Sequence, residues 1–405
     1  MSDEALYREA KRTALILAAA QAIVGASAPI AISMGGLAGS YLLGADKSLA
    51  TAPVTGFNVG VALAALPAAM LMRAIGRRYG LVAGAGANAL GGAVAAFALF
   101  QADFWLFAFG MLLVGAGTAF TQQYRFAAVD NAPADFKPRA IAWVLSGGIF
   151  SAVIGPQTAI HTREMFAPVM FAGAFVGIIG LAAIGALILS LLRLPKDAPS
   201  AALDDHQPAR PLLEIMSQPR FIVALLCGVS TFALMSFVMT GAPLAMVGCG
   251  FSPDEATLGI SWHVLAMFAP SFFTGRLIAR FGKERIVATG LALLIGCGVV
   301  ALSGIELWQF WLALILLGVG WNFGFIGATA MVADCYHLSE KNKVQGVHDF
   351  LLFSTVAFAS LMSGRVYNAF GWEMLNWVIF PVAGAGLLVL GLLALGRRRA
   401  RAALR

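Results

Sequence analysis

The chain has 405 residues, of which 60% are hydrophobic and only 12% are charged. Soluble domains average about 45–50% apolar and about 25% charged residues, so this composition excludes an ordinary soluble protein and indicates an integral membrane protein. The formal net charge of +7 does not indicate a nucleic-acid partner, because the basic residues lie mostly between the apolar runs.

Apolar runs of about 20 residues, the length that crosses a bilayer core as a helix, follow one another along the chain. They predict twelve membrane spans, at about 13–43, 52–73, 80–100, 104–129, 139–160, 166–192, 220–246, 257–280, 285–303, 308–334, 343–367 and 374–395. The predicted fold class is an all-α membrane protein. An even number of spans places both termini on the same side of the membrane.

Lys and Arg residues decide which side that is, because they accumulate in cytoplasmic loops. With the termini inside, all of the 27 Lys and Arg residues lie on the cytoplasmic side except Lys47, Arg125, Arg163 and Arg365. The chain has no Asn-x-Ser/Thr sequon, which fits a bacterial protein. We therefore expect a multi-pass protein of the bacterial cell inner membrane with both termini in the cytoplasm.

The residues that carry chemistry in enzymes form no catalytic pattern here. The four cysteines have neither C-x-x-C nor Cys/His spacing, so they predict neither a disulfide framework nor a metal site. The spans show no nucleophile and base at helical spacing. We therefore expect no enzyme activity, no metal and no cofactor.

The second half of the chain repeats the first. The turn at 72–80, MRAIGRRYG, is similar to GRLIARFGKER at 275–285, and Gly115 and Gly117 recur as Gly318 and Gly320. Internal repeats of this kind are typical of transporters whose site lies between two halves. We predict two pseudo-symmetric six-helix halves, at 1–192 and 220–405, joined by a proline-rich cytoplasmic linker at 193–219.

These features resemble the major facilitator superfamily over nearly the whole chain. The residues that match its loop motif, which controls the conformational change, are Gly76, Arg77, Arg78, Gly275, Arg280 and Gly282. Arg73 and Ala279 stand where the family has its loop aspartates. The resemblance implies a secondary transporter, or permease, that works by alternating access of two halves around a central site.

Two further stretches narrow the resemblance. AFTQQYRFAA with AIAWVLSGGIFSAVIGP, at 140–156, and KVQGVHDFLLF, at 343–353, look like a group of bacterial permeases, some of which are similar to riboflavin importers. His348-Asp349 stands where that group has Asn-Asp. Gly155-Pro156 is similar to a helix motif of antiporters but lacks its trailing glycine pair, so we interpret it as a packing kink. The alternative function is a drug or metabolite efflux antiporter, and a transporter-like membrane sensor is a further one.

Polar residues inside apolar spans are rare and are default candidates for a solute cavity. The candidates in this chain are Gln21, Asn58, Gln122, Gln123, Trp143, Trp321 and Asn322. For each of them the structural alternative is an interhelical hydrogen bond, which contributes about 0.6 kcal/mol on average.

At helical spacing, Thr118, Gln122 and Arg125 fall on one face and form a polar stripe. The repeat aligns this stripe with an aromatic and small one in the second half, formed by Trp321, Phe325 and Ala328. A cavity with hydrogen-bonding groups on one wall and aromatic rings on the other suits a planar, polar-edged organic solute such as a flavin. We expect the protein to act as a monomer, with this solute and the lipid bilayer as its partners.

Arg125 is a charge inside a span and needs an explanation. It either extends its head group to the nearby interface or serves a gate. Asp349, with His348 beside it, is the acid that lies well inside a span. Because Arg125 and Asp349 lie at similar depth in opposite halves, we predict a cross-half pair that closes the cytoplasmic side. The alternative is that Arg125 pairs with Asp130 in its own half.

The coupling ion is left open by the sequence. Asp349 with His348 is one candidate proton carrier, and His263 is the other, although a lone histidine beside Trp262 is more often a packing contact. Proton-linked transport and facilitated diffusion are therefore both retained, as are uptake and efflux.

Overall fold

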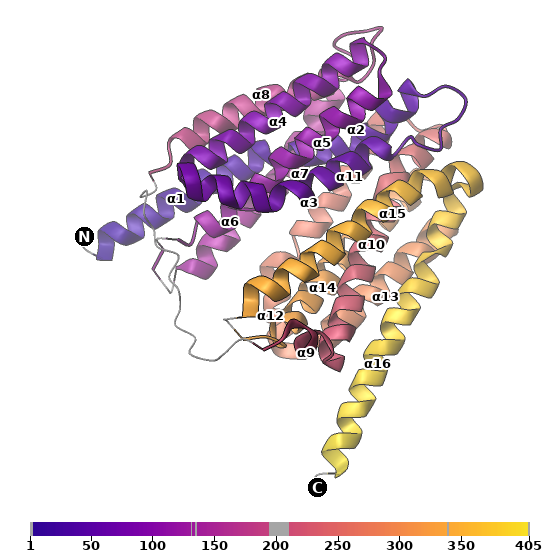
Figure 1. Cartoon of the computed structure of the whole chain (residues 1–405). Coiled ribbons are helices and arrows are strands. Elements are labelled where there is room, and N and C mark those ends of the chain that lie inside the picture. The colour runs from indigo at the N-terminus through magenta and orange to yellow at the C-terminus, as the bar shows by residue number, and fades with distance from the viewer. Residues whose placement is uncertain (1–2, 131, 134–135, 194–209, 338–339, 404–405) are drawn as a thin grey trace.

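Helices account for all the regular structure in the described part of the chain. The computed structural model describes residues 3–130, 132–133, 136–193, 210–337 and 340–403, and over these ranges it contains no strand. The helices form two bundles, one from each half of the chain (Figure 1). The predicted all-α fold class is confirmed.

The first bundle contains the first eight helices. They are α1 Asp3–Val24, α2 Ser27–Leu42, α3 Ala52–Ile75, α4 Arg77–Phe100, α5 Phe104–Thr121, α6 Tyr124–Ala127, α7 Lys137–Thr162 and α8 Ala172–Ser190. The predicted sixth span was expected to begin at residue 166, but the backbone turns as far as Phe171, whose φ of 68° is left-handed, before α8 begins.

The second bundle follows a short helix at the end of the predicted linker, α9 Leu212–Met216. Its helices are α10 Pro219–Gly248, α11 Pro253–Phe268, α12 Ser271–Phe281, α13 Lys283–Leu302, α14 Leu307–Ala333, α15 Lys341–Trp377 and α16 Ile379–Ala403. Residues 194–209 of the predicted linker lie outside the described residues, and the boundaries of the two halves stay a prediction.

The number of membrane spans agrees with the predicted twelve. Ten described segments are long and apolar enough to cross a membrane, and the bent pair α11 and α12 adds one more. One of the ten, Lys343–Gly396, has 54 residues, which is about 80 Å of helix and more than twice a bilayer core of about 30 Å. It is interrupted at Gly371, whose φ of 77° and ψ of −173° are not helical, so it makes two spans.

Several spans that the sequence predicts as continuous helices are broken, the eighth and the fourth among them. Between α11 and α12 the axis bends by 43° at Pro270, a residue type that has no N–H for the helix ladder. Between α5 and α6 the amide of Gln123 bonds to the carbonyl of Phe120, three residues back, which tightens the turn. Side chains after this break therefore do not continue the faces of α5.

The repeat is visible in the backbone of two turns. Gly76, between α3 and α4, has φ 88° and ψ 151°, and Gly282, between α12 and α13, has φ 88° and ψ 154°. A positive φ of this kind strains any residue with a Cβ. The glycines of the two loop motifs therefore make the same tight connection between neighbouring spans.

Close helix packing holds each bundle together. In the first bundle Phe107 and Phe175 pack edge to face with ring centroids 5.0 Å apart, and in the second Phe310 and Trp372 lie 4.9 Å apart. Between α13 and α14, a side chain at Gly290 would collide with the backbone of Gly324. Small residues at such crossings allow the contact that drives helix association in lipid.

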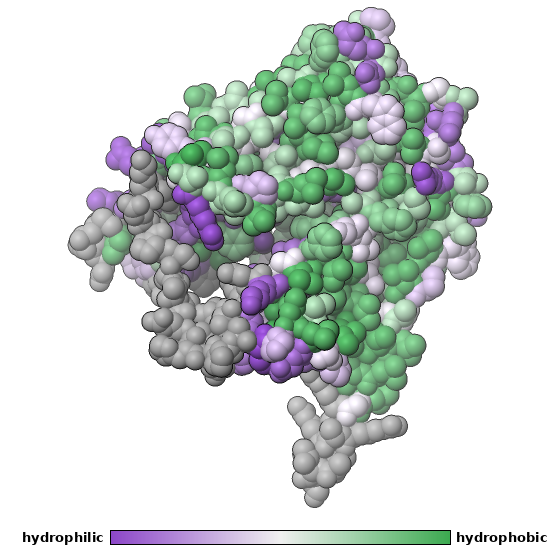
Figure 2. Space-filling view, in the orientation of Figure 1, coloured by the Kyte–Doolittle hydropathy of each residue, from purple (hydrophilic) through white to green (hydrophobic). Residues whose placement is uncertain are grey.

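The molecule has two functionally distinct ends. We call the end that carries both termini and α9 the linker end, and the end that carries the loops at 43–51, 163–171 and 249–252 the far end (Figure 1). Figure 2 shows an apolar surface over the middle of the bundles on this face, with the strongly polar residues gathered at its edges. That pattern fits helices that cross lipid from one end to the other.

Candidate functional site

Contacts between the two bundles close the far end. Arg163, after α7, forms an ion pair with Asp254 on α11: Nη2 donates a hydrogen bond of 3.3 Å to Oδ2, and Nε lies 2.8 Å from Oδ1. Nearby, Thr51 Oγ1 accepts a hydrogen bond of 3.2 Å from the backbone N–H of Gly364 on α15. The absence of a side chain at Gly364 allows this approach, because a Cβ there would collide with Thr51.

The contact between bundles continues toward the middle of the molecule. Ser261 on α11 donates a hydrogen bond of 2.5 Å to the carbonyl oxygen of Ala152 on α7. Further along the same pair of helices, the ring of Phe268 lies against Gly148. The two halves are therefore joined along α7 and α11 from the far end inward.

At the linker end the described ion pairs stay within one bundle. Arg77 Nε lies 2.5 Å from Asp130 Oδ2 in the first half, and Lys283 Nζ lies 2.5 Å from Asp334 Oδ1 in the second. Each cation directly follows the repeated glycine. Asp130 and Asp334, at the ends of the fourth and tenth spans, therefore pair with the basic residues of the two loop motifs, in which the aspartates are missing.

Asp130 is fully engaged by its own half. Burial raises the pKa of the Asp130 carboxyl, while the neighbouring Arg77 and Lys137 lower it by less. The sequence left Asp130 open as a partner for Arg125, but its carboxylate contacts Arg77.

Arg125 and Asp349 lie on opposite sides of the separated linker end. Arg125 is exposed on α6, where its guanidinium sits 4.8 Å above the ring of Phe126. The Asp349 side chain on α15 is 61% exposed and accepts a 3.0 Å hydrogen bond from Nδ1 of His348. Within the described residues neither charge forms a salt bridge with a residue of the other bundle.

Four aromatic side chains meet where α10, α14 and α15 face one another. This aromatic cluster consists of Phe232, Trp321, Phe325 and Phe353, all half-buried. Trp321 and Phe325 are stacked with centroids 5.1 Å apart and planes 17° apart, and Phe232 lies 5.4 Å from Trp321 and 6.1 Å from Phe353. Trp321 is near the middle of the 27-residue α14 and Phe232 near the middle of the 30-residue α10, so the cluster lies at mid-membrane depth.

The indole of Trp321 has an unused hydrogen-bond donor. Its Nε1 is buried and bonds to no described group. A buried donor without a partner costs about 1–3 kcal/mol, so an acceptor brought by a solute would gain from meeting it. Trp321 therefore offers a solute both a flat apolar ring surface and one hydrogen-bond donor.

The polar candidates of the first half are distributed over several helices. Gln122 is exposed and Gln123 half-buried at the break after α5, whereas Thr118 is buried and donates to the carbonyl of Val114 in its own helix. The three residues therefore do not present one open polar stripe, because Gln122 and Arg125 are exposed whereas Thr118 is buried.

Gln21 and Asn58 are half-buried on α1 and α3. Gln21 lies where α1 approaches α7, so that a Cβ on Gly147 would come 2.9 Å from the Cβ of Gln21. Their roles as cavity residues stay predictions.

Asn322 and Trp143 have packing partners instead of an open surface. The fully buried amide of Asn322 donates to Met267 O and Ser271 Oγ, both at 2.7 Å, and accepts from Thr274 Oγ1 at 2.6 Å. These bonds bridge the break between α11 and α12. Trp143 packs edge to face against Phe136 with centroids 5.5 Å apart.

His263 is a packing residue, as its sequence context suggests. It is fully buried on α11 and its Nδ1 lies 2.8 Å from the carbonyl oxygen of Leu314 on α14. Its Nε2 is buried without a hydrogen-bond partner among the described residues, so His263 and the His348–Asp349 pair both stay predictions for the proton carrier.

Sequence reasoning missed the far-end closure and half of the aromatic cluster. Arg163 was noticed only as one of the few basic residues outside, and Asp254, Thr51 and Gly364 were not singled out. Basic residues are rare in loops on the non-cytoplasmic side. Arg163 in such a predicted loop was therefore the signal that could have indicated a specific acidic partner.

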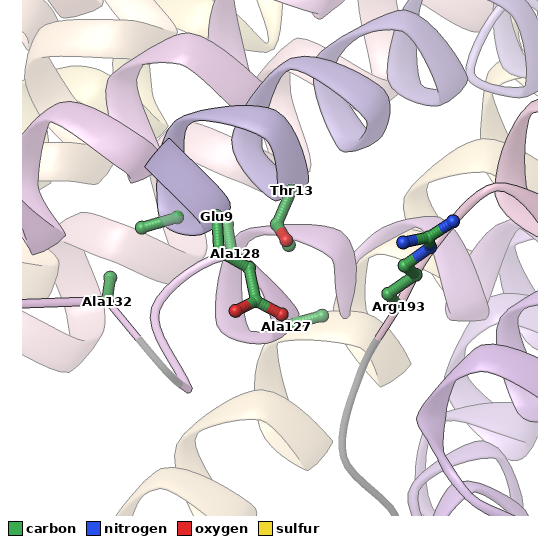
Figure 3. Close-up of a pocket in the computed structure, with 7 residues that line it drawn as sticks. Glu9, Thr13, Ala127, Ala128, Ala132 and Arg193 are labelled. Carbon is green, nitrogen blue, oxygen red and sulfur yellow. The ribbon is translucent and has the colours of Figure 1, made fainter. Parts of the chain in front are cut away.

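No described group of side chains suits a metal ion. A small pocket at the linker end is lined by Glu9 and Thr13 of α1, Arg193 and alanines beside α6 (Figure 3). It has space for no more than a water molecule, so it does not compete with the region between the halves as a solute site.

Two repeated six-span bundles that meet along α7 and α11, with polar and aromatic side chains on their helices, are the architecture of a membrane transporter of the alternating-access class. The chain belongs to the major facilitator superfamily, whose family model matches residues 13–252 and again 226–404. It is accordingly a secondary transporter of a small organic solute, as the resemblance in its motifs implied.

Two curated proteins illustrate the relationship. The chain is 50% identical over 383 residues to the riboflavin transporter RfnT of Brucella anthropi, a match that covers 94% of this chain and 95% of that protein. It is 31% identical to the MFS-type transporter YddS of Bacillus subtilis over 94% of this chain and 89% of that one.

A solved structure supports the fold. A mutant of the nucleoside transporter NupG superimposes with a TM-score of 0.65 over 93% of this chain and 98% of that chain, at 12% sequence identity. At that identity the likeness concerns the fold alone.

Proposed function

We propose that the protein imports riboflavin or a closely related flavin across the bacterial inner membrane. The observation that carries this proposal is the 50% identity, over 94% of the chain, to a protein named as a riboflavin transporter. The linker end faces the cytoplasm in this proposal, because the basic residues gather there.

The aromatic cluster supports this choice of solute. The isoalloxazine ring of a flavin is flat and aromatic, and stacking or edge-to-face contact between aromatic groups contributes about 0.5–1.5 kcal/mol beyond the buried area. Trp321 and Phe325 already pair in a stacked arrangement at mid-membrane depth. We expect the flavin ring to lie against Trp321, with its carbonyl edge accepting a hydrogen bond from Nε1.

The first half supplies polar groups. Gln122 and Arg125 are exposed and Gln123 and Gln21 are half-buried in the first half. Amide and guanidinium groups donate to the carbonyl and hydroxyl oxygens that a flavin carries on its ring edge and ribityl chain. A solute with one aromatic face and one hydroxylated tail thus matches both halves.

Binding to the purified protein tests the proposal. Riboflavin is fluorescent and its emission falls on stacking with an indole, so titration of the protein should quench it saturably. Trp321→Phe should weaken binding about 5- to 20-fold, the equivalent of about 1–2 kcal/mol for one lost hydrogen bond and a weaker stack.

The matched control is Trp105→Phe, because the Trp105 side chain is 67% exposed on the outer surface of α5. This variant should bind riboflavin as the parent does. The proposed site would be contradicted if the parent protein did not quench riboflavin fluorescence, or if Trp321→Phe and Trp105→Phe lost the same amount of riboflavin affinity.

A further inference from the structure

Helix α12 exposes most of its surface although it forms the linker-end part of a span. Its axis bends away from α11 by 43° at Pro270, and it ends at Gly282 at the linker end (Figure 1). Among the eleven residues of α12, all of which the structure describes, only Thr274 is buried. This short helix therefore presents most of its side chains to the surroundings of the bundle.

Two arginines form a basic strip on the exposed face of α12. Arg276 and Arg280 are exposed and one helical turn apart, so their Cβ atoms lie about 6 Å from each other. They precede Gly282 by about 9 Å and about 3 Å along the helix axis, which is the depth of the lipid headgroups at the end of a span.

The basic strip has no carboxylate partner within the described residues. Arg276 bonds to the carbonyl of Phe272 at 3.4 Å, and the guanidinium of Arg280 lies 5.2 Å from the ring centroid of Phe281. Both contacts stay within α12 and leave the positive charge of each guanidinium unneutralised. An anion from outside the protein would therefore gain from binding here.

The carboxylates close to this strip are already paired. Asp334 lies beside Lys283 Nζ and 2.7 Å from Arg220 Nη2, and Glu284 Oε1 lies 3.1 Å from Arg220 Nη1. Arg285, in the first turn of α13, is a further exposed cation without a salt bridge to a described residue. The corner formed by α12 and the start of α13 thus has an excess of positive charge.

Phenylalanines flank the basic strip. Phe272 is 51% exposed, Phe273 43% and Phe281 44%. At about 100° per residue, Phe272 lies about 40° from Arg276 on one side of the strip, and Phe273 lies about 20° from Arg280 on the other. Arginines beside exposed aromatic rings on one short helix are typical of helices that lie in the headgroup region, where the rings contact acyl chains and the cations contact phosphates.

We propose that the exposed face of α12 binds an anionic phospholipid: Arg276 and Arg280 hold its phosphate, and Phe272 and Phe273 contact its acyl chains. A guanidinium donates two parallel hydrogen bonds to a phosphate and stays protonated throughout the physiological pH range. The exposed rings favour a lipid over a free anion, because a free anion gains nothing from apolar contact. This α12 lipid site does not depend on which solute the protein carries.

The corresponding corner of the first half lacks this arrangement. Helix α3 ends at the equivalent glycine, Gly76, but its last turn holds a single arginine, Arg73. Arg78 follows the glycine on α4, where its guanidinium lies 5.7 Å from the ring centroid of Tyr79. Two cations on different helices do not form a strip along one face. We therefore expect the lipid site in the second half only.

Native mass spectrometry of the purified full-length protein in detergent tests the α12 lipid site. The protein is titrated with phosphatidylglycerol, with phosphatidylcholine of the same acyl chains, or with glycerol 3-phosphate, which carries the phosphate without the chains. The first phosphatidylglycerol should bind more tightly than the first phosphatidylcholine. Glycerol 3-phosphate at the same concentration should not displace it.

Arg276→Gln with Arg280→Gln should weaken the binding of phosphatidylglycerol about 5- to 20-fold. This corresponds to about 1–2 kcal/mol, since one basic residue near an anionic lipid surface contributes about 1 kcal/mol. The affinity for phosphatidylcholine should stay unchanged, which also shows that the variant is folded. Arg276→Lys with Arg280→Lys keeps the charge and should retain most of the affinity for phosphatidylglycerol.

Arg73→Gln with Arg139→Gln is the matched control, because it removes the same charge from two exposed arginines at the linker end of the first half. It should leave the affinity for phosphatidylglycerol within twofold of the parent value. The α12 lipid site is ruled out if phosphatidylglycerol binds no more tightly than phosphatidylcholine, or if glycerol 3-phosphate displaces it. Equal losses in the control and in the α12 variant would also rule it out, because the attraction would then be a diffuse effect of net charge.

Discussion

The far end and the linker end hold similar groups but use them differently. At the far end, the ion pair between Arg163 and Asp254 joins the halves, and the side chain of Thr51 accepts a hydrogen bond from the backbone N–H of Gly364. At the linker end the described ion pairs, Arg77–Asp130 among them, stabilise each half separately. If transport separates the halves at the far end, as alternating access requires, the contacts between halves are the ones that have to break, while the contacts within a half can stay.

The largest expected effect comes from wedging the far end open. Gly364→Val places a branched side chain where even a Cβ would collide with Thr51. Overpacking costs about 1–3 kcal/mol, which would shift the equilibrium between the two conformations about 5- to 150-fold away from the far-end-closed form. The distance between spin labels at Gln101→Cys and Ile305→Cys, two exposed positions at the far end, should lengthen, and solute uptake should fall at least about fivefold.

Gly346→Val is the matched control, because Gly346 lies on the same helix with open space around it. This variant should keep the parent distances. An unchanged far-end distance in the Gly364→Val protein would show that the Thr51 contact does not close this end.

A smaller effect is expected in stability at the α11–α12 break, between the two ends. Asn322→Ala removes the three hydrogen bonds that the amide makes with Met267, Ser271 and Thr274. The free energy of unfolding should fall by about 1–3 kcal/mol, whereas riboflavin affinity should change less than twofold. Asn88→Ala, at a buried amide with one weak bond of 3.5 Å, should cost less.

Measurement of thermal stability and of fluorescence quenching on the same samples separates the two effects. A large loss of affinity in Asn322→Ala with unchanged stability would instead return Asn322 to the cavity, where the sequence placed it.

The smallest effect concerns pH at the linker end. The hydrogen bond from Arg210 is the main reason that the pKa of the Glu340 carboxyl lies far below its ordinary value of about 4.3. The stabilisation from a lowered carboxyl pKa is present above the unfolded value and is lost only as pH falls through the folded value. Between pH 5 and pH 8 the Arg210–Glu340 contact should therefore not change.

Hydrogen exchange of the Arg210 and His337 amides, both bonded to Glu340, measures this contact. Their protection, corrected for intrinsic rates, should be equal at pH 5.5 and pH 7.5. Glu340→Gln should lower it at both values. Loss of protection in the parent at pH 5.5 would show that another titrating group controls the contact.

The sequence predicted the membrane class, the spans and the repeat, because each depends on local composition and periodicity. Apolar runs alone located the twelve spans, and the glycine turns at Gly76 and Gly282 followed from their similar neighbours. The aromatic wall was anticipated at Trp321 and Phe325 from the repeat alone. The family and the class of function were likewise predicted correctly from motifs.

What the sequence did not predict depends on contacts between distant residues. A helical projection assigned Thr118 and Arg125 to one polar stripe, but Thr118 is buried and bonds to the carbonyl of Val114, whereas Arg125 is exposed. Asn322 was assigned to a cavity because a polar residue in a span either lines a cavity or forms a hydrogen bond between helices. Only its hydrogen-bond partners distinguish these two roles. Arg163 and Asp254 are far apart in the chain, so no local pattern joins them.

Uptake of labelled riboflavin tests the central claim most directly. The protein is produced in a bacterial riboflavin auxotroph without an importer of its own, and also reconstituted in vesicles on which a pH gradient can be imposed. We predict saturable uptake that excess unlabelled riboflavin abolishes, that nucleosides do not affect, and that Trp321→Phe reduces. The response to the pH gradient separates proton-linked transport from facilitated diffusion. No uptake above that of cells without the protein, or equal competition by nucleosides, would contradict the proposed function.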